Sequence, residues 1–129
     1  MRLIEIKNSP KKKEKQYFGN IENETIDNKN YRKVLFTSKN IQLVVMSLKP
    51  DEEIGMETHE NGAQFIRVEQ GKAEIVIGKE KYNASDNDVV IIPEGTPHNV
   101  TNIGKADLKL YVLYAPPEHD DGVVQLNKN

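Results

Sequence analysis

Short apolar segments separated by turn-forming residues dominate the sequence from residue 33 onward. Gly, Pro, Asn, Asp and Ser recur between these segments, and no stretch beyond residue 31 repeats its apolar residues with a helical period. Strands at a regular spacing of about 8–12 residues favour an antiparallel sandwich or barrel. We therefore predict an all-β fold with strands over residues 33–37, 40–48, 63–70, 72–78, 81–84, 88–92, 98–103 and 107–115.

The chain has 129 residues, a length that suits a single domain. We predict an N-terminal arm over residues 1–30, in which Leu3, Ile4 and Ile6 add an edge strand. A barrel follows over residues 31–117. Residues 118–129 form a C-terminal tail, and residues 123–129 are expected to be a loose arm.

Composition excludes several classes of function. Lys and Arg number 18 and Asp and Glu number 20, so no basic surface is expected to bind nucleic acid. No apolar run approaches the ~20 residues of a membrane-spanning helix, so no membrane partner is expected either. The absence of cysteine excludes disulfides, thiolate metal sites and cysteine nucleophiles, and it fits the cytoplasmic location that we expect.

Glu57, His59, Gln64 and His98 are the candidate site residues. Alternation along an extended segment places Glu57 and His59 on one face. The Asn-Gly pair at residues 61–62 is typical of a tight hairpin turn, which would return Gln64 toward His59.

His98 follows the turn Pro-Glu-Gly-Thr-Pro at residues 93–97. The two prolines restrict the backbone and the glycine permits an unusual conformation, so the turn holds the imidazole in a defined place. Imidazole and carboxylate are good ligands for divalent Fe, Mn, Ni, Co or Zn. The Gln64 amide would be a weaker, neutral ligand or would orient a bound water. From these residues alone, ordinary surface or hydrogen-bonded core positions are the alternative.

Two stretches resemble the two sequence motifs of the cupin family. Residues 55–71 are similar to the first motif and residues 87–102 to the second. In similar cupins three histidines and one glutamate bind the metal. Here the first histidine position holds Glu57 and the glutamate position holds Gln64, so one carboxylate and three neutral donors remain. The matching residues of the second motif are Asn87, in place of a glycine, Pro93, Gly95, His98 and Asn102.

The resemblance implies a double-stranded β-helix, that is, a jelly-roll barrel like those of small single-domain cupins labelled mannose-6-phosphate-isomerase-like. It implies a divalent metal ion held by Glu57, His59, Gln64 and His98, with Glu57 also acting as a catalytic base. It also implies a homodimer, and it leaves Asn102 to brace the turn before His98.

The resemblance indicates a small-molecule substrate and leaves isomerisation, dioxygenation and decarboxylation open. The alternative is a non-enzymatic barrel that binds a small ligand or a metal, and a third possibility is a barrel that has lost its site. We expect His119, in the tail, to be an exposed loop residue.

Overall fold

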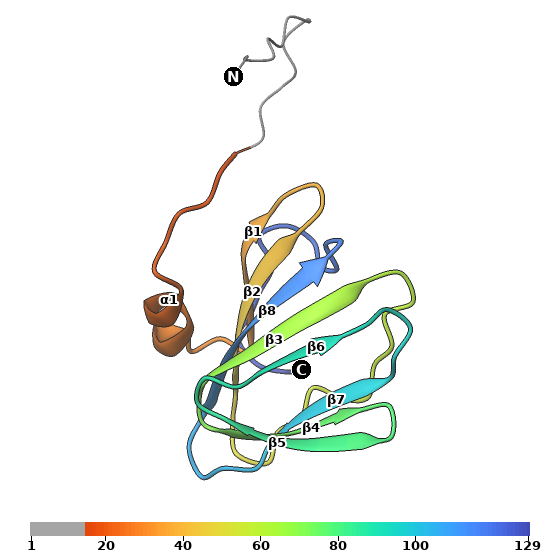
Figure 1. The fold of residues 1–129 in the computed structure, drawn as a ribbon. Helices are drawn as coiled ribbons and strands as arrows, with labels where there is room; N and C mark the ends of the chain where they lie inside the picture. Colours follow the sequence, from red (N-terminus) through yellow and green to blue (C-terminus); the bar gives the residue numbers. More distant parts are fainter. Residues whose placement is uncertain (1–14) are drawn as a thin grey trace, which may run out of the picture.

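The computed structural model describes residues 15–129, and this part of the chain folds into one helix and nine strands (Figure 1). The helix α1 spans Ile21–Asp27. The strands are β1 Arg32–Thr37, β2 Gln42–Leu48, β3 Ala63–Gln70, β4 Lys72–Ile77, β5 Glu80–Ser85, β6 Val89–Ile92, β7 His98–Asn102, β8 Leu108–Ala115 and β9 Val124–Gln125.

Two antiparallel sheets pack against each other. The larger has the strand order β6-β3-β8-β2-β1-β9, and the smaller has the order β5-β4-β7. Isolated bridges from Glu53 to Thr101 and from Glu57 to His98 add a further extended segment beside β7. The fold is a jelly roll, the double-stranded β-helix expected from the sequence (Figure 1).

The core lies between the two sheets and follows strand alternation. Val44, Met46 and Leu48 of β2 are fully buried, and β4 and β7 contribute Ile75 and Val100 from the opposite sheet. Since alternate residues of a strand point to opposite faces, the same alternation decides which polar residues enter the barrel.

The turn after β5 explains one departure from the family motif. Asn87 occupies the position where the motif carries glycine, and its φ is 75°, in the left-handed region. Asparagine tolerates this region better than other residues with a Cβ. The substitution therefore preserves the turn that leads into β6.

The N-terminal region differs from the expected arm. Residues 21–27 form α1, which the sequence analysis did not anticipate. The side chain of Asn20 caps the helix by accepting a hydrogen bond from the backbone N–H of Asn23 at 2.9 Å. Within the helix, Thr25 is fully buried. Leu3, Ile4 and Ile6 lie outside the described residues, and the division of the chain into arm, barrel and tail stays a prediction.

Two expected connections are wrong. Residues 123–129 are not a loose arm, because β9 pairs with β1 and Tyr31 donates a backbone hydrogen bond to Leu126 at 3.2 Å. The turn at residues 61–62 does not close a hairpin, because the segment before it pairs with β7 and β3 lies between β6 and β8. Among the described residues, no helix has the length and apolar character needed to cross a membrane.

Candidate metal centre

Glu57, His59 and His98 gather at one end of the barrel. One ligand atom from each lies within 4.8 Å of the others. The imidazole centroids are 5.2 Å apart, and His59 Nε2 lies 3.9 Å from Glu57 Oε1. Glu57 and His98 are cross-strand partners that exchange two backbone hydrogen bonds of 2.9 Å, so the sheet itself sets their spacing.

The turn before β7 orients His98 and also holds His59. Gly95 has a φ of 74°, a conformation that glycine adopts without strain, and its N–H donates to the His59 carbonyl at 2.8 Å. His98 Nδ1 lies 2.8 Å from the Thr96 carbonyl oxygen. Because a carbonyl can only accept, Nδ1 carries the proton and Nε2 keeps a free lone pair.

Glu118 orients His59 in the same way. His59 Nδ1 lies 3.2 Å from Glu118 Oε1, so the protonated Nδ1 donates to the carboxylate and Nε2 is left as an acceptor. Such a carboxylate beside a ligating imidazole fixes its ring orientation and raises its basicity.

Gln64 occupies the inner face of β3. It is 3% exposed, and its register partners are Ile92 and Tyr114. Its Oε1 is buried with no hydrogen-bond partner, and so are His59 Nε2 and His98 Nε2. Each such orphaned atom costs roughly 1–3 kcal/mol. Three unpartnered acceptors on three predicted ligands, beside the Glu57 carboxylate, form a donor set that fits a divalent cation.

The structure therefore brings three of the four predicted residues within a few ångströms of one another. Coordination by Gln64 stays a prediction. The Glu57 side chain is 34% exposed and the His59 side chain is 12% exposed. The site is therefore more open to solvent at the Glu57 carboxylate.

Gln42 fastens the segment that carries Glu118. Its side chain is fully buried on the inner face of β2. Nε2 donates to His119 O at 2.7 Å and to Thr37 Oγ1 at 2.9 Å, while Oε1 accepts from the backbone N–H groups of Glu118 at 3.1 Å and His119 at 2.9 Å. This amide ties residues 118–119 across the end of the barrel.

His119 is not the exposed loop residue expected from the sequence. It is partly buried, its Nε2 lies 3.3 Å from the Tyr114 hydroxyl, and its ring meets that of Tyr114 edge-on at 5.1 Å. Burial, with the positive charge of Arg32 as the next cause, lowers the pKa of His119 to about 4. Burial also raises the pKa of Tyr114, so its hydroxyl stays protonated and can donate to His119.

The pKa of His119 predicts a loss of stability in mild acid. Below pH ~6.5 the unfolded chain binds a proton at this residue, whereas the folded protein does not until about pH 4. Stability should fall across this window. Because His119 is partly exposed, solvent screening reduces the full value, and we expect about 1–2 kcal/mol.

Urea unfolding of the wild type and His119→Gln at pH 7, 6, 5 and 4 measures this contribution. The advantage of the wild type over the variant should shrink as the pH falls. A constant difference across the series would contradict the low pKa.

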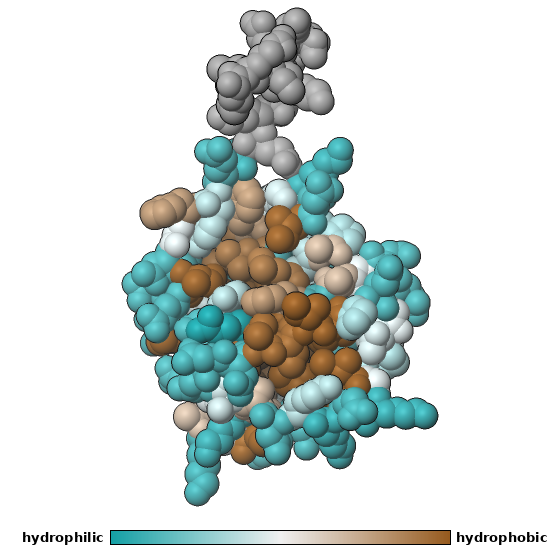
Figure 2. Space-filling model, viewed as in Figure 1, coloured by the Kyte–Doolittle hydropathy of each residue, from teal (hydrophilic) through white to brown (hydrophobic). Residues whose placement is uncertain are grey.

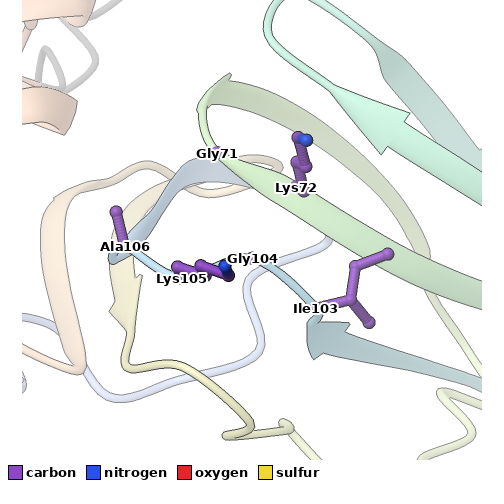
Figure 3. A pocket seen from close by; sticks show the side chains of 6 residues that line it. All are labelled: Gly71, Lys72, Ile103, Gly104, Lys105 and Ala106. Carbon is purple, nitrogen blue, oxygen red and sulfur yellow. The ribbon is translucent and has the colours of Figure 1, made fainter.

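Of two surface hollows, one borders the site and the other lies away from it. One, of about 290 Å³, is lined by residues 58–62 and 116–118 and reaches His59 and Glu118 from outside. Another, of about 500 Å³, lies beside the start of β4 and the connection from β7 to β8 (Figure 3). Its lining has lysines but no imidazole or carboxylate, so it offers no metal ligands. It consists of Gly71, Lys72, Ile103, Gly104, Lys105 and Ala106.

Sequence reasoning missed the residues that support the ligands. Gln42 carried a usable signal, since a polar residue that shares its face with Val44 and Met46 must find partners inside the barrel. The expectation that Asn102 braces the turn before His98 is wrong. It bonds the carbonyls of Leu48 and Ala106, each at 2.9 Å, and so holds the loop after β7.

Comparisons with known proteins agree with this architecture. The Cupin domain model matches residues 44–114. YrkC, an uncharacterised protein of Bacillus subtilis, is 42% identical over an alignment of 120 positions that covers 88% of this chain and 64% of that protein. The mannose-1-phosphate guanylyltransferase RfbM of Salmonella typhimurium is 31% identical over 77 residues, which are 60% of this chain and 16% of that protein.

Among solved structures, BH2720 of Bacillus halodurans superposes with a TM-score of 0.87 at 38% identity, over 88% of this chain and 91% of that chain. The chain thus spans a little under two thirds of YrkC but nearly all of a solved homologous structure. The match to the Cupin domain model covers more than half of the sequence, and it agrees with the fold and with the arrangement of the site. The chain belongs to the cupin family.

Proposed function

We propose that the protein binds a divalent metal ion through Glu57, His59 and His98, with Gln64 as a fourth, neutral ligand, and acts on a small organic molecule there. The observation that carries this proposal is that ligand atoms of Glu57, His59 and His98 lie within 4.8 Å of one another, while His59 Nε2 and His98 Nε2, and Gln64 Oε1 on the predicted fourth ligand, are buried without hydrogen-bond partners. In a folded interior such atoms normally have partners, and one bound cation would satisfy them together.

The charge of the donor set supports turnover as well as binding. Glu57 is the one carboxylate among the proposed ligands, so a divalent ion would keep about one positive charge and could polarise a bound oxygen of the substrate. Glu57 is also the most exposed proposed ligand, so its carboxylate, once it leaves the metal, could take a proton from a molecule entering the site. Isomerisation, decarboxylation and dioxygenation all fit this arrangement.

The direct test is elemental analysis of protein purified without a nickel column, followed by titration of the metal-free protein with Fe, Mn, Ni, Co and Zn. We expect close to one divalent ion per chain. Protein that is isolated metal-free and takes up none of these ions would overturn the proposal.

Glu118 should matter to metal affinity although it is not a proposed ligand. In Glu118→Ala the His59 imidazole loses its partner at Nδ1, and we expect the metal Kd to rise about 10–100-fold. Competition with a coloured chelator measures it. Glu60→Ala is the matched control, since that neighbouring carboxylate is exposed and makes no ion pair with either imidazole. Equal affinities in the two variants would remove Glu118 from the site.

A non-enzymatic metal-binding or ligand-binding barrel is the second candidate. The neutral Gln64, in the position where similar cupins carry a carboxylate, favours it, because a neutral amide holds a divalent ion less strongly. Tight capture of a ligand without its conversion would support this reading.

We also propose a homodimer formed through the outer face of the larger sheet. Figure 2 shows apolar residues gathered over the middle of the face where β2, β8, β3 and β6 lie in Figure 1. Ile91 is 66% exposed there, and it borders an apolar hollow together with Phe65 and Leu113. Light scattering that returns the mass of one chain would refute the dimer. A cytoplasmic location stays a prediction.

A further inference from the structure

Arg32 is a positive charge on the inner face of β1. It shares that face with buried Val34 by strand alternation, and its partner in β2 is Met46, which is fully buried. Its side chain is partly buried, and the Nε atom is buried completely. The guanidinium group therefore belongs to the barrel interior rather than to the outer surface.

The partners of Arg32 are all neutral. Its Nη1 donates to Gln125 Oε1 at 2.6 Å, and its guanidinium carbon lies 5.1 Å from the centre of the Tyr31 ring, whose hydroxyl it also meets. Its Nε–H has no hydrogen-bond partner. Within the described part of the chain, no carboxylate reaches Arg32 at ion-pair distance. Arginine is seldom held inside a protein without a counter-charge.

The charge of Arg32 influences two aromatic side chains at the proposed metal centre. Tyr114 contacts His59 edge-on with 5.8 Å between the ring centroids, and it contacts His119 on its other side. Burial is the largest influence on the pKa values of Tyr114 and His119, and the positive charge of Arg32 is the next, lowering both. The charge of Arg32 thus acts on two of the rings beside the proposed ligands.

We propose that Arg32 receives the carboxylate of a small, singly charged organic acid whose other end reaches the proposed metal ion, so the inference names the substrate class of the proposed function and rests on it. The charges favour a single negative charge. A divalent ion and Arg32 together outweigh the Glu57 and Glu118 carboxylates by one positive charge. A monocarboxylate would neutralise this excess, whereas a phosphate dianion would leave the interior negative.

The unpartnered Nε–H supports the same assignment. A carboxylate oxygen that accepts from it would supply both the missing hydrogen bond and the missing counter-charge. Hydrogen bonds between charged groups are about twice as strong as those between neutral groups. Loss of this contact should therefore weaken binding about tenfold or more.

The test is isothermal titration calorimetry of the Co²⁺-loaded protein with pyruvate, acetate and inorganic phosphate. We expect the wild type to bind pyruvate, whose keto oxygen can reach the ion, more tightly than acetate or phosphate. The Kd for pyruvate should rise about tenfold or more in Arg32→Gln. Lys33→Gln is the matched control, because it removes the same charge from the next residue of β1, on the opposite face. Its Kd should stay within about twofold of the wild type.

Metal content is measured in every variant, which separates the two proposals. Wild-type protein that takes up no cobalt means that the proposed function has failed. Wild-type protein that holds cobalt but binds neither acid, or binds them as tightly in Arg32→Gln, overturns this inference alone. Tighter binding of phosphate overturns the choice of a carboxylate.

Arg32→Lys keeps the test decisive if the glutamine variant misfolds. It retains the charge but not the planar guanidinium group, so its affinity should fall below that of the wild type while its cobalt content stays the same. Undiminished affinity for pyruvate in the folded lysine variant would count against a direct contact from the guanidinium group.

Discussion

Metal binding should be lost in His98→Ala. His98 is 3% exposed, its Nδ1 is engaged by the Thr96 carbonyl, and its Nε2 is one of the unpartnered atoms that point to a ligand. We expect the Kd for Co²⁺ or Mn²⁺ to rise more than about 100-fold, since the loss of a mere supporting partner already costs 10–100-fold. At a metal concentration of 100 times the wild-type Kd, the ion should stabilise the wild type by about 2.7 kcal/mol and the variant by less than about 0.4 kcal/mol.

Differential scanning calorimetry with and without metal measures this effect. For a chain of this length the wild-type Tm should rise by roughly 8–12 °C on loading, while the Tm of His98→Ala should rise by no more than about 2 °C. Thr101→Ala is the matched control, because Thr101 lies on the same strand with its side chain on the opposite face. Equal shifts in all three proteins would show that the ion binds elsewhere.

Gln42→Ala should be the most destabilising single change among the supporting residues. It removes four hydrogen bonds at a fully buried position, and it leaves the backbone of residues 118–119 without those partners. The cavity and the lost bonds together should lower the free energy of unfolding by about 3–5 kcal/mol. Because Glu118 is then free to leave His59, metal affinity should fall as well.

Urea unfolding of the metal-free protein measures the loss in the free energy of unfolding, and a metal titration measures the loss in metal affinity. Thr37→Val serves as the comparison, since it deletes only the hydroxyl that accepts from Gln42 and should cost about 0.5–1.5 kcal/mol. A loss in Gln42→Ala no larger than that of Thr37→Val would mean that the clamp on residues 118–119 contributes little.

The grouping of Glu57, His59 and His98 could be predicted from the sequence because local rules decide where their side chains lie. Alternation put Glu57 and His59 on one face, and the proline and glycine turn indicated a fixed position for His98. The same local reasoning predicted strands β1 to β8 to within two residues, because each lies between turn-forming residues, but it missed β9. Gln64 was predicted as a candidate, but by way of a hairpin that the barrel does not contain.

The supporting residues could not be predicted in this way. Glu118 reaches His59 because Gln42 holds the backbone of residues 118–119. Gln42 lies 77 positions before His119 in the sequence. Arg32 has its hydrogen-bond partner Gln125 at a distance of 93 positions. Contacts of this range depend on how both sheets close, and neither periodicity nor a short motif carries that information. Helix α1 was missed because a polar seven-residue segment shows no apolar period.

The clamp between β2 and residues 118–119 also bears on when the site could form during synthesis. A ribosome releases Glu57, His59, Gln64 and His98 well before Glu118, yet His59 is oriented only once Glu118 is in place. Closure of β1 against β9 comes later still. A nascent chain would therefore display its ligands before it could hold an ion firmly. Firm binding of the proposed ion would have to wait until residues 118–119 are fastened across the end of the barrel.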